Sequence, residues 1–451
     1  MSPAFFSLAL HRALEEANAR LQPGEALIAY LDDVYILTRP ERTRAAFDTV
    51  TQVIENTAGI RPNLGKCACW NARAGEAPPG IAELGSEEDK VWRGDGPEAE
   101  RGLIILGNPV GTAEFVRTQA QQRMEKEQGL LDWLPKMGDL QCAWLLLALC
   151  ATPRANHVVR ALPPTQAREY AAEHDSRIWN TLQQLLGHAP HRDRARRART
   201  LAALPGRLGG LGLRSAERTS PAAYWASWAD ALEVIRQRRP NEAAAFLAEL
   251  ERVGGAQAPC LREVQEAADL LDHEGFEHAG VGARPSWREL FEGARPPQRE
   301  DRGETEPGEW INGWQFYASS TRETHYREHH LMPNMSRASR ATLRSQSGPQ
   351  AAAWLTAVPT SPATTLLPVL FQICLRRRLR LPLMLSNRRC EGCRAILDSL
   401  GDHRAACSVS GRLRRRAKPI ELAWSAVFTE AGAVVPNLEV FECPQDRLEV
   451  R

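Results

Sequence analysis

The sequence predicts an α+β protein whose strands are confined to the first quarter of the chain. Two short β-favouring runs flank a pair of aspartates within residues 26–37, and another strand-like run with a glycine-marked turn occupies residues 102–111. From residue 115 onward helical spacing dominates, with long patterns at about 115–135, 140–151 and 165–187. Because the chain has 451 residues, of which 43% are hydrophobic, we expect two or three folding units.

The overall charge identifies no partner, because 57 Lys and Arg residues nearly balance 55 Asp and Glu residues. Basic residues nevertheless cluster in three runs, at 192–199, 376–380 and 412–418. Each run is either a solvated helix face or a loop on the one hand, or a surface for nucleic acid on the other.

The N-terminal apolar stretch is short and lacks a basic leader, and the longest apolar run, 143–151, is well below the roughly 20 residues of a membrane span. Ten scattered cysteines without a secretion signal do not indicate a disulfide framework. We therefore expect an intracellular protein, nuclear or cytoplasmic, that is not secreted and has no membrane partner.

The doubled aspartate lies between two predicted strands. A helical pattern at 4–21 precedes residues 26–31 and 34–37, and a second helical pattern follows at 42–57. The two strands would form a hairpin with Asp32 and Asp33 at its tip. Asp tolerates turn geometry without any functional role, so a plain turn is one interpretation. The other is a metal site, because two-metal nucleotidyl transfer needs carboxylates that hold Mg²⁺ ions about 3.5–4 Å apart.

The segments from residue 204 onward give weaker indications of structure and function. The glycine-dense stretch 204–216 could cradle a phosphate, but no GxGxxG follows a clear strand and no GK[ST] is present, which favours a structural turn. A Trp- and Ala-rich helix follows it. Residues 251–310 are rich in Gly, Pro, Glu and Arg and indicate a linker or loosely packed helices, and an apolar helix returns at 363–375.

A cluster of metal-ligand residue types lies near the C-terminus. Two cysteines at x2 spacing, Cys390 and Cys393, are followed by His403 and then by Cys407 at x3 spacing. Thiolate and imidazole ligands suit Zn²⁺, and a tight knuckle followed by a helical pair can converge on one tetrahedral ion. Free cysteines in a reducing compartment are the alternative, although they leave the spacing of the histidine unexplained.

Four segments in order resemble the reverse transcriptases of non-LTR (LINE-like) retrotransposons. "AYLDDVYILT" (29–38) resembles their catalytic hairpin, and "SPAFFSLALHRAL" (2–14) resembles the helix that precedes it. "FDTVTQVIENTAGIRPNLGKCACWN" (47–71) and "LIILGNPVG" (103–111) resemble the two segments that follow. The resemblance implies a two-metal RNA-directed DNA polymerase whose partners are an RNA template and a DNA primer or target. Asp32 would be the main Mg²⁺ ligand, Asp33 its partner and Lys66 a cation near the triphosphate, whereas Leu106 and Gly107 would position the primer. An exposed turn lysine is the plainer interpretation of Lys66.

The cysteine cluster extends the resemblance to the subgroup with a C-terminal restriction-like endonuclease, which has a CCHC knuckle. "GDHRAAC" (401–407) carries the histidine and the last cysteine of that pattern. The basic flank would bind phosphates without reading sequence. Its predicted contact residues are Arg412, Arg414, Arg415, Arg416 and Lys418.

The resemblance implies a linear organisation of the chain. We expect the C-terminal part of a palm at 1–112, a helical thumb-like domain at 113–250 and a partly irregular connector at 251–385. The zinc knuckle with its basic flank would occupy 386–418, and the start of an endonuclease-like region 419–451.

The departures from the family bear on activity. The chain begins inside the "PLSP" segment, no aspartate precedes Asp32, and the sequence ends where nuclease residues would follow. We therefore expect a chain truncated at both ends that lacks polymerase and nuclease activity by itself. The alternative is a non-catalytic RNA- or DNA-binding protein that acts through the thumb-like domain and the knuckle.

Overall fold

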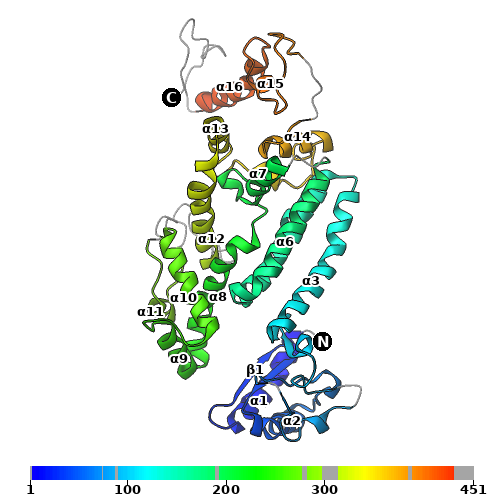
Figure 1. The fold of residues 1–451 in the computed structure, drawn as a ribbon, viewed down its shortest axis with the longest axis vertical. Helices are drawn as coiled ribbons and strands as arrows, with labels where there is room; N and C mark the ends of the chain where they lie inside the picture. Colours follow the sequence, from blue (N-terminus) through cyan, green and yellow to red (C-terminus); the bar gives the residue numbers. More distant parts are fainter. Residues whose placement is uncertain are drawn as a thin grey trace. The chain divides into compact units, whose positions relative to one another are not determined.

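The structure is a computed structural model that describes residues 3–73, 75–86, 90–187, 192–276, 282–296, 313–383 and 389–430. The chain forms two compact units (Figure 1). The first unit comprises Met1–Leu131, Pro153–Arg177 and Ser215–Tyr326, and the second comprises Asp132–Thr152, Ile178–Arg214 and Arg327–Arg451. Each unit therefore draws on segments that are far apart in the sequence. Most elements are helices, and the two sheets are small antiparallel hairpins, so the α+β class is correct for the described residues.

The first unit begins with two helices that pack against a hairpin. These elements are α1 (Pro3–Arg20), β1 (Ala26–Tyr30), β2 (Asp33–Leu37) and α2 (Thr43–Ala58). Their apolar residues at helical spacing form one core, in which Leu10, Ala13, Val50 and Val53 are buried. The α2 helix ends at Gly59, whose φ of 67° suits a left-handed C-terminal cap.

The tip of the first hairpin lies one residue earlier in the chain than the sequence predicts. Tyr30 pairs with Asp33, so the two-residue loop consists of Leu31 and Asp32, and Asp33 is the first residue of β2. The sequence pattern is ambiguous here because either aspartate can occupy a turn. Leu31 has a φ of 56°, a left-handed conformation that is unfavourable for a bulky side chain.

The strand-like run at 102–111 is a second hairpin rather than a single strand. Strands β3 (Gly102–Ile105) and β4 (Asn108–Gly111) pair in antiparallel register. Their loop consists of Leu106 and Gly107, with φ values of 49° and 79°. Two successive residues with positive φ give the backbone twist of a type I′ hairpin turn.

A small hydrophobic cluster, formed by the segment between the two hairpins, includes two cysteines. Cys67 and Cys69 pack against buried Ile81, Val91 and Trp92. Burial raises the pKa of Cys69 to about 11, which makes it a poor nucleophile or metal ligand at neutral pH. These two cysteines serve packing.

The rest of the first unit is helical. It contains most of α3 (Ala113–Trp133), α5 (Ala155–Ala161), the first part of α6 (Pro164–Leu185), α8 (Ala216–Arg238), α9 (Pro240–Leu250), α10 (Pro259–His273), α11 (Trp287–Glu292) and α12 (Trp314–His325). The expectation of a linker or loose helices at 251–310 is wrong for α10 and α11. Leu261, Val264 and Leu271 of α10 are at most 3% exposed, and they pack with Trp225 of α8.

The second unit is also helical. It contains α4 (Leu140–Leu145) with its π-helical continuation Leu146–Ala151, the last part of α6, α7 (Arg192–Ala203), α13 (Arg337–Ser345), α14 (Pro368–Arg378), α15 (Asp402–Ala406) and α16 (Arg412–Glu430). Trp144 is fully buried, and its indole N–H donates to the carbonyl oxygen of Leu355 at 2.8 Å. The predicted helices at about 115–135, 140–151 and 165–187 correspond to α3, to α4 with its continuation, and to α6.

The glycine-dense stretch 204–216 is a structural turn. A Cβ atom at Gly210 would lie 2.1 Å from the carbonyl oxygen of Leu204, and one at Gly209 would lie 2.5 Å from Leu343 of α13. Gly209 also has a φ of 93°. Close approach and backbone conformation therefore explain these glycines without a phosphate ligand.

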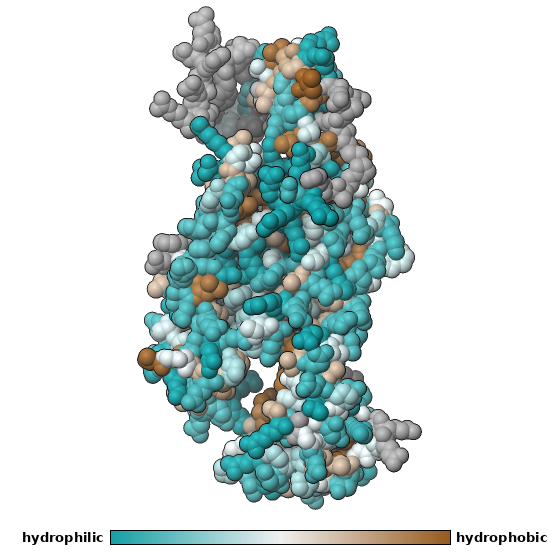
Figure 2. Space-filling model, viewed as in Figure 1, coloured by the Kyte–Doolittle hydropathy of each residue, from teal (hydrophilic) through white to brown (hydrophobic). Residues whose placement is uncertain are grey.

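On the face drawn in Figure 2, hydrophobic side chains form small patches in a hydrophilic surface. Among the described helices, none is long and apolar enough to cross a membrane.

Candidate metal centre and nucleic-acid interface

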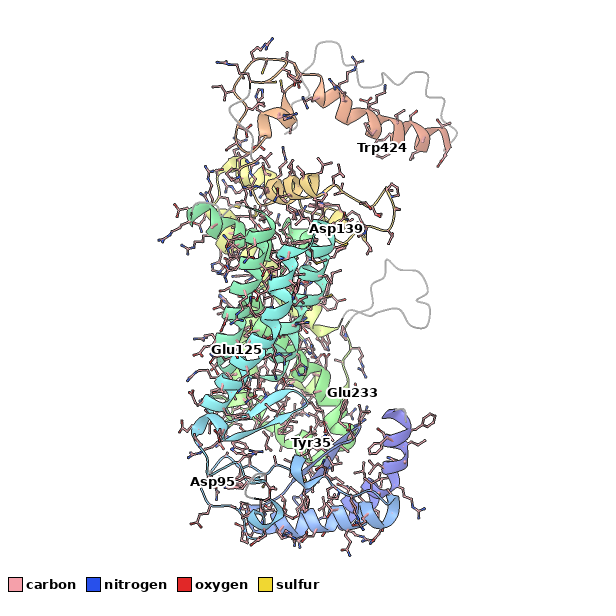
Figure 3. All side chains as sticks on the ribbon, turned by 90° about the vertical axis from the view of Figure 1, so that its right-hand side faces the viewer. Tyr35, Asp95, Glu125, Asp139, Glu233 and Trp424 are labelled. Carbon is pink, nitrogen blue, oxygen red and sulfur yellow. The ribbon has the colours of Figure 1, made fainter. Side chains whose placement is uncertain are left out.

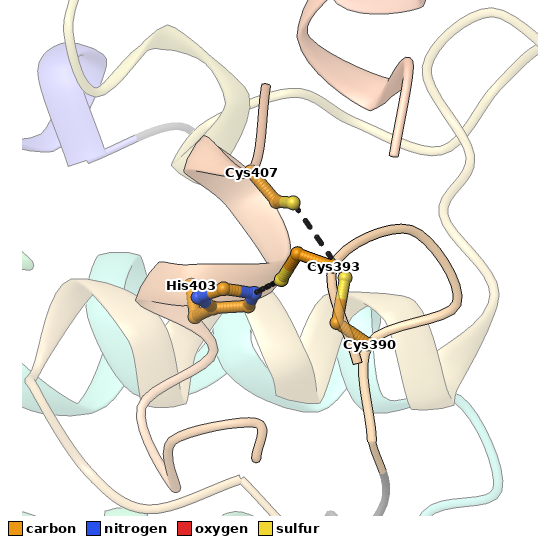
Figure 4. Close-up of side chains that lie close together, drawn as sticks. All are labelled: Cys390, Cys393, His403 and Cys407. Atoms are coloured by element: carbon orange, nitrogen blue, oxygen red, sulfur yellow. Dashed lines mark hydrogen bonds between the residues drawn. The ribbon is translucent and has the colours of Figure 1, made fainter. Parts of the chain in front are cut away.

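The four predicted zinc ligands converge in the structure. The Sγ atoms of Cys390, Cys393 and Cys407 and a ring nitrogen of His403 all lie within 4.8 Å of one another (Figure 4). Cys390 Sγ is 3.6 Å from Cys407 Sγ, and Cys393 Sγ is 3.1 Å from His403 Nε2. A tetrahedral Zn²⁺ site with these ligands has ligand–ligand edges of about 3.5–3.8 Å. The cluster can therefore hold a metal ion, and four protein ligands would close the site in the manner of a structural metal.

The first two ligands lie on a tight backbone turn. The Cys390 N–H donates to the carbonyl of Ala395, and the Arg394 N–H donates back to the carbonyl of Cys390. Gly392 lies against the next segment, because a Cβ atom there would be 2.6 Å from the backbone of Ser410. Only glycine fits at this position without a shift of the backbone.

The backbone of the knuckle also stabilises the thiolate form of Cys390 over the thiol. Backbone N–H groups of Cys393 and Gly392 point at the sulfur of Cys390 and lower its pKa to about 7. Burial acts to raise the pKa of Cys407, but the backbone N–H of Ser410 and hydrogen bonds from the side chains of Cys393 and Ser410 together lower it. The backbone N–H of Ala395 acts to lower the pKa of Cys393, but burial and the thiols of Cys407 and Cys390 outweigh it and raise that pKa. Because the metal ligand is the thiolate, we expect metal affinity to fall as the pH is lowered and protons compete for the sulfur atoms.

The second pair of ligands is positioned by Asp398. Its carboxylate accepts hydrogen bonds from the backbone N–H groups of Leu400, Asp402 and His403, at 2.9, 3.0 and 2.6 Å. Burial acts to raise the pKa of Asp398, but these N–H groups outweigh burial and lower it. A charged Asp398 therefore fixes the start of α15, the helix that carries His403.

The knuckle is attached to α14 by the basic run at 376–380. The Arg380 guanidinium donates to both carboxylate oxygens of Asp402, at 2.8 and 2.7 Å, and Arg377 donates to the carbonyl of Gly401 at 2.9 Å. Arg376 and Arg378 are only 5% and 6% exposed, and they donate to the carbonyls of Leu186 and Gly210, respectively. This run is neither a solvated face nor a nucleic-acid surface, because its arginines join parts of the protein.

The predicted basic flank forms the first turns of α16, five residues after the last cysteine ligand. Arg412 donates to Glu391 of the knuckle at 3.0 Å and thereby ties the helix to the metal cluster. Arg414, Arg415 and Lys418 are exposed. Arg416 lies in the helix, but its side chain is outside the described part of the structure. Residues 431–451 of the predicted endonuclease-like region are also outside the described residues.

The predicted Mg²⁺ ligands Asp32 and Asp33 are both exposed at the first hairpin tip. Lys66 is exposed in a short 3-10 turn, Leu64–Lys66. Within the described residues, the knuckle is the one group of three or more Cys, His, Asp or Glu side chains close enough to share a metal ion. No third carboxylate from this part of the chain joins the two aspartates.

The two hairpin tips meet through Tyr35, which Figure 3 labels on β2. Its hydroxyl donates to Asp33 Oδ2 at 3.3 Å, and the backbone amide of Leu106 approaches the same hydroxyl. Burial raises the pKa of Tyr35, and the charge of Asp33 acts in the same direction. The backbone amide of Leu106 acts to lower this pKa, but less strongly than burial raises it. The carbonyl of Leu106 lies 3.1 Å from His157 Nε2 of α5. The aspartate pair and the Leu106–Gly107 turn, about 70 residues apart, are therefore linked.

Sequence reasoning missed the side chains that support the ligands. Asp398, Arg380 and Asp402 carry no metal-binding spacing, and their roles depend on backbone geometry. Gly392, inside the CxxC turn, was the one supporting residue with a visible signal.

Comparison with protein-family models, with curated proteins and with solved structures gives no match for this chain.

Proposed function

We propose that this chain is a nucleic-acid-binding protein of the reverse-transcriptase type found in non-LTR retrotransposons, and that it binds through a zinc knuckle and the basic start of α16. The observation that carries the proposal is the convergent Cys₃His cluster with a basic helix tied to it by the Arg412–Glu391 pair. A rigid fold that presents several fixed cations suits the phosphate backbone of a nucleic acid.

Zinc is the ion that suits the cluster best. Three thiolates and one imidazole form a borderline-soft ligand set, and no ligand position remains open for substrate. When bound, the ion would fix the turn that carries Cys390 and the helix that carries His403. The arginines of α16 would then be presented from a single rigid body.

The polymerase part of the proposal rests on the paired hairpins. Asp32 would contribute the main Mg²⁺-binding carboxylate and Asp33 a second, while Lys66 would approach the triphosphate. The link from Asp33 through Tyr35 to Leu106 supports this assignment, because a polymerase must hold its metal-binding carboxylates next to the primer end. The parent activity would be RNA-directed DNA polymerisation.

Two exposed carboxylates do not by themselves make a two-metal site. We therefore predict that the purified chain alone does not extend a DNA primer on an RNA template with Mg²⁺. Primer extension that Asp32→Ala abolishes would overturn this statement and assign a complete polymerase activity to the chain.

The binding proposal is tested with three variants of the full chain. Cys390→Ser should lose bound zinc, whereas Cys374→Ser, which changes an exposed cysteine of α14, should keep it. The triple variant Arg412→Gln, Arg414→Gln and Arg415→Gln should retain zinc but bind a labelled RNA about tenfold more weakly. Unchanged RNA binding by both the zinc-free variant and the triple variant would remove the knuckle from the proposed function.

A further inference from the structure

Two helices of the second unit carry exposed arginines that the knuckle does not use. On α7 these are Arg192, Arg194, Arg196 and Arg197, and on α13 they are Arg337, Arg340 and Arg344. The α7 helix has a single acidic residue, Asp193, and α13 has none. Among the described residues, none forms an ion pair with any of these seven arginines. Elsewhere many arginines do pair, as Arg61 does with Glu55 and Arg288 with Glu251.

The arginines of α13 share one face of the helix. Positions 337, 340 and 344 follow the i, i+3, i+7 spacing that aligns side chains, whereas Leu343 is buried on the side that packs against Gly209. At 1.5 Å per residue the stripe is about 10 Å long, and it spans about three phosphates at 3.4 Å each along a strand.

Both helices are fixed to one scaffold. The turn after α7 contacts α13, because Gly209 lies against Leu343. The guanidinium of Arg378 joins the segments that follow the two helices, because it donates to the carbonyls of Gly206 and Gly210 after α7 and to that of Gln346 after α13, at 2.8, 2.8 and 3.2 Å. The arginine surface is therefore held by buried contacts and does not depend on the knuckle.

Such a surface is unfavourable without a partner. Arg337 and Arg340, Arg340 and Arg344, and Arg192 and Arg196 are like charges three or four residues apart, a spacing that destabilises a helix. A polyanion would relieve this repulsion. All seven cations are arginines, whose planar guanidinium groups can each bind a phosphate through two parallel N–H bonds.

We propose that α7 and α13 form a second nucleic-acid-binding surface, which takes the phosphate backbone of an RNA or DNA strand without reading its sequence. The inference extends the proposed function, since it assumes nucleic acid as the partner, but it assigns the contact to a different part of the second unit. The regular spacing of charge along α13 favours a polymer with a regular charge repeat over an acidic protein.

The test compares three forms of the zinc-loaded full chain by fluorescence anisotropy with a short labelled single-stranded RNA over a range of KCl concentrations. The first form is wild type, and the second is Arg337→Gln, Arg340→Gln and Arg344→Gln. The third, Arg61→Gln, Arg252→Gln and Arg288→Gln, removes the same charge from exposed, acid-paired arginines of the first unit. With about 0.7 counterions released per single-strand phosphate contact, the α13 variant should reduce the slope of log affinity against log salt by about 2. Its affinity should fall roughly tenfold, and the control should match wild type.

The outcomes separate this inference from the knuckle proposal. If the α13 variant keeps the wild-type slope and affinity, the second surface is wrong whatever the knuckle does. If the α13 variant loses binding while Cys390→Ser and the Arg412, Arg414 and Arg415 variant both keep it, the second surface stands and the knuckle proposal fails. If polyglutamate competes as well as RNA, the surface fits an acidic protein and this inference is overturned. If wild type binds no RNA at low salt, both proposals fail.

Discussion

Asp398 fixes His403 without being one of the four residues that could hold a metal ion. Its carboxylate accepts three backbone N–H groups at the start of α15, and one of these belongs to His403. Hydrogen bonds to a charged acceptor contribute about 1.5–3 kcal/mol each when the partner is removed. Residues outside the coordination shell that orient a ligand in this way commonly change metal affinity by about 10–100-fold.

We predict that Asp398→Asn lowers zinc affinity by about tenfold, because the neutral amide oxygen is a weaker acceptor for three N–H groups. Competition with a chromophoric chelator measures the affinity. Glu391→Gln is the matched control, since Glu391 is an exposed acid of the same knuckle that pairs with Arg412. Equal affinities for the Asp398 variant and wild type would show that α15 is held by other contacts.

Glycines in the chain differ sharply in the room they leave for a side chain. A Cβ atom at Gly392 would be 2.6 Å from the backbone of Ser410, whereas one at Gly129 in α3 would meet nothing within 4 Å beyond its own helix backbone. Gly392→Ala should therefore weaken zinc binding, and Gly129→Ala should raise the free energy of unfolding by about 0.5–1 kcal/mol through helix propensity. Zinc titration and urea unfolding measure the two effects. A Gly392→Ala protein with normal zinc affinity would contradict the tight packing of the knuckle.

At the scale of elements, helices with regular apolar spacing were predictable and those defined by distant contacts were not. The patterns for α1, α2, α3 and α6 gave bounds within a few residues, because each buries one stripe of side chains. The packing of α10 was missed because a Gly-, Pro- and Glu-rich composition outweighed its apolar spacing. The hairpin tip was displaced by one residue, since two aspartates offer two turn positions.

The role of the α14 arginines also could not be predicted from the sequence alone. Sequence composition makes 376–380 a basic surface, but Arg378 is buried and its guanidinium donates to four backbone carbonyls, of Gly206, Gly210, Gln346 and Ala351. Only the fold brings these carbonyls to one place. By contrast, the convergence of Cys390, Cys393, His403 and Cys407 was predictable in full, because residue type and spacing alone indicate a tetrahedral set that could hold a metal ion.

We predict that Arg378→Gln lowers the free energy of unfolding by about 3 kcal/mol, because it leaves several buried carbonyls without a donor. Urea denaturation measures the change. Arg214→Gln, at an exposed position of the same unit, should change the stability by less than about 0.5 kcal/mol. Similar small effects for both variants would contradict the scaffold role given to Arg378.

At the scale of the whole molecule, the two candidate sites in the described residues lie in different units. The first unit holds the paired hairpins with Asp32, Asp33 and the Leu106–Gly107 turn, and the second holds the Cys₃His cluster and the arginine-rich helices. The linear domain boundaries at 112, 250, 385 and 418 stay a prediction. The proposed binding function depends on the second unit and does not require the hairpins to be catalytically complete.

The most direct test of the account is RNA binding by the full chain before and after removal of zinc. Wild-type protein is treated with a chelator at neutral pH, its anisotropy titration with labelled RNA is recorded, and Zn²⁺ is then restored. We predict that the zinc-free chain binds RNA at least about tenfold more weakly and that one equivalent of Zn²⁺ restores the affinity, because the ion fixes the knuckle that carries α16. A zinc-free chain with unchanged affinity and salt dependence would contradict the central claim that a zinc-organised knuckle binds nucleic acid.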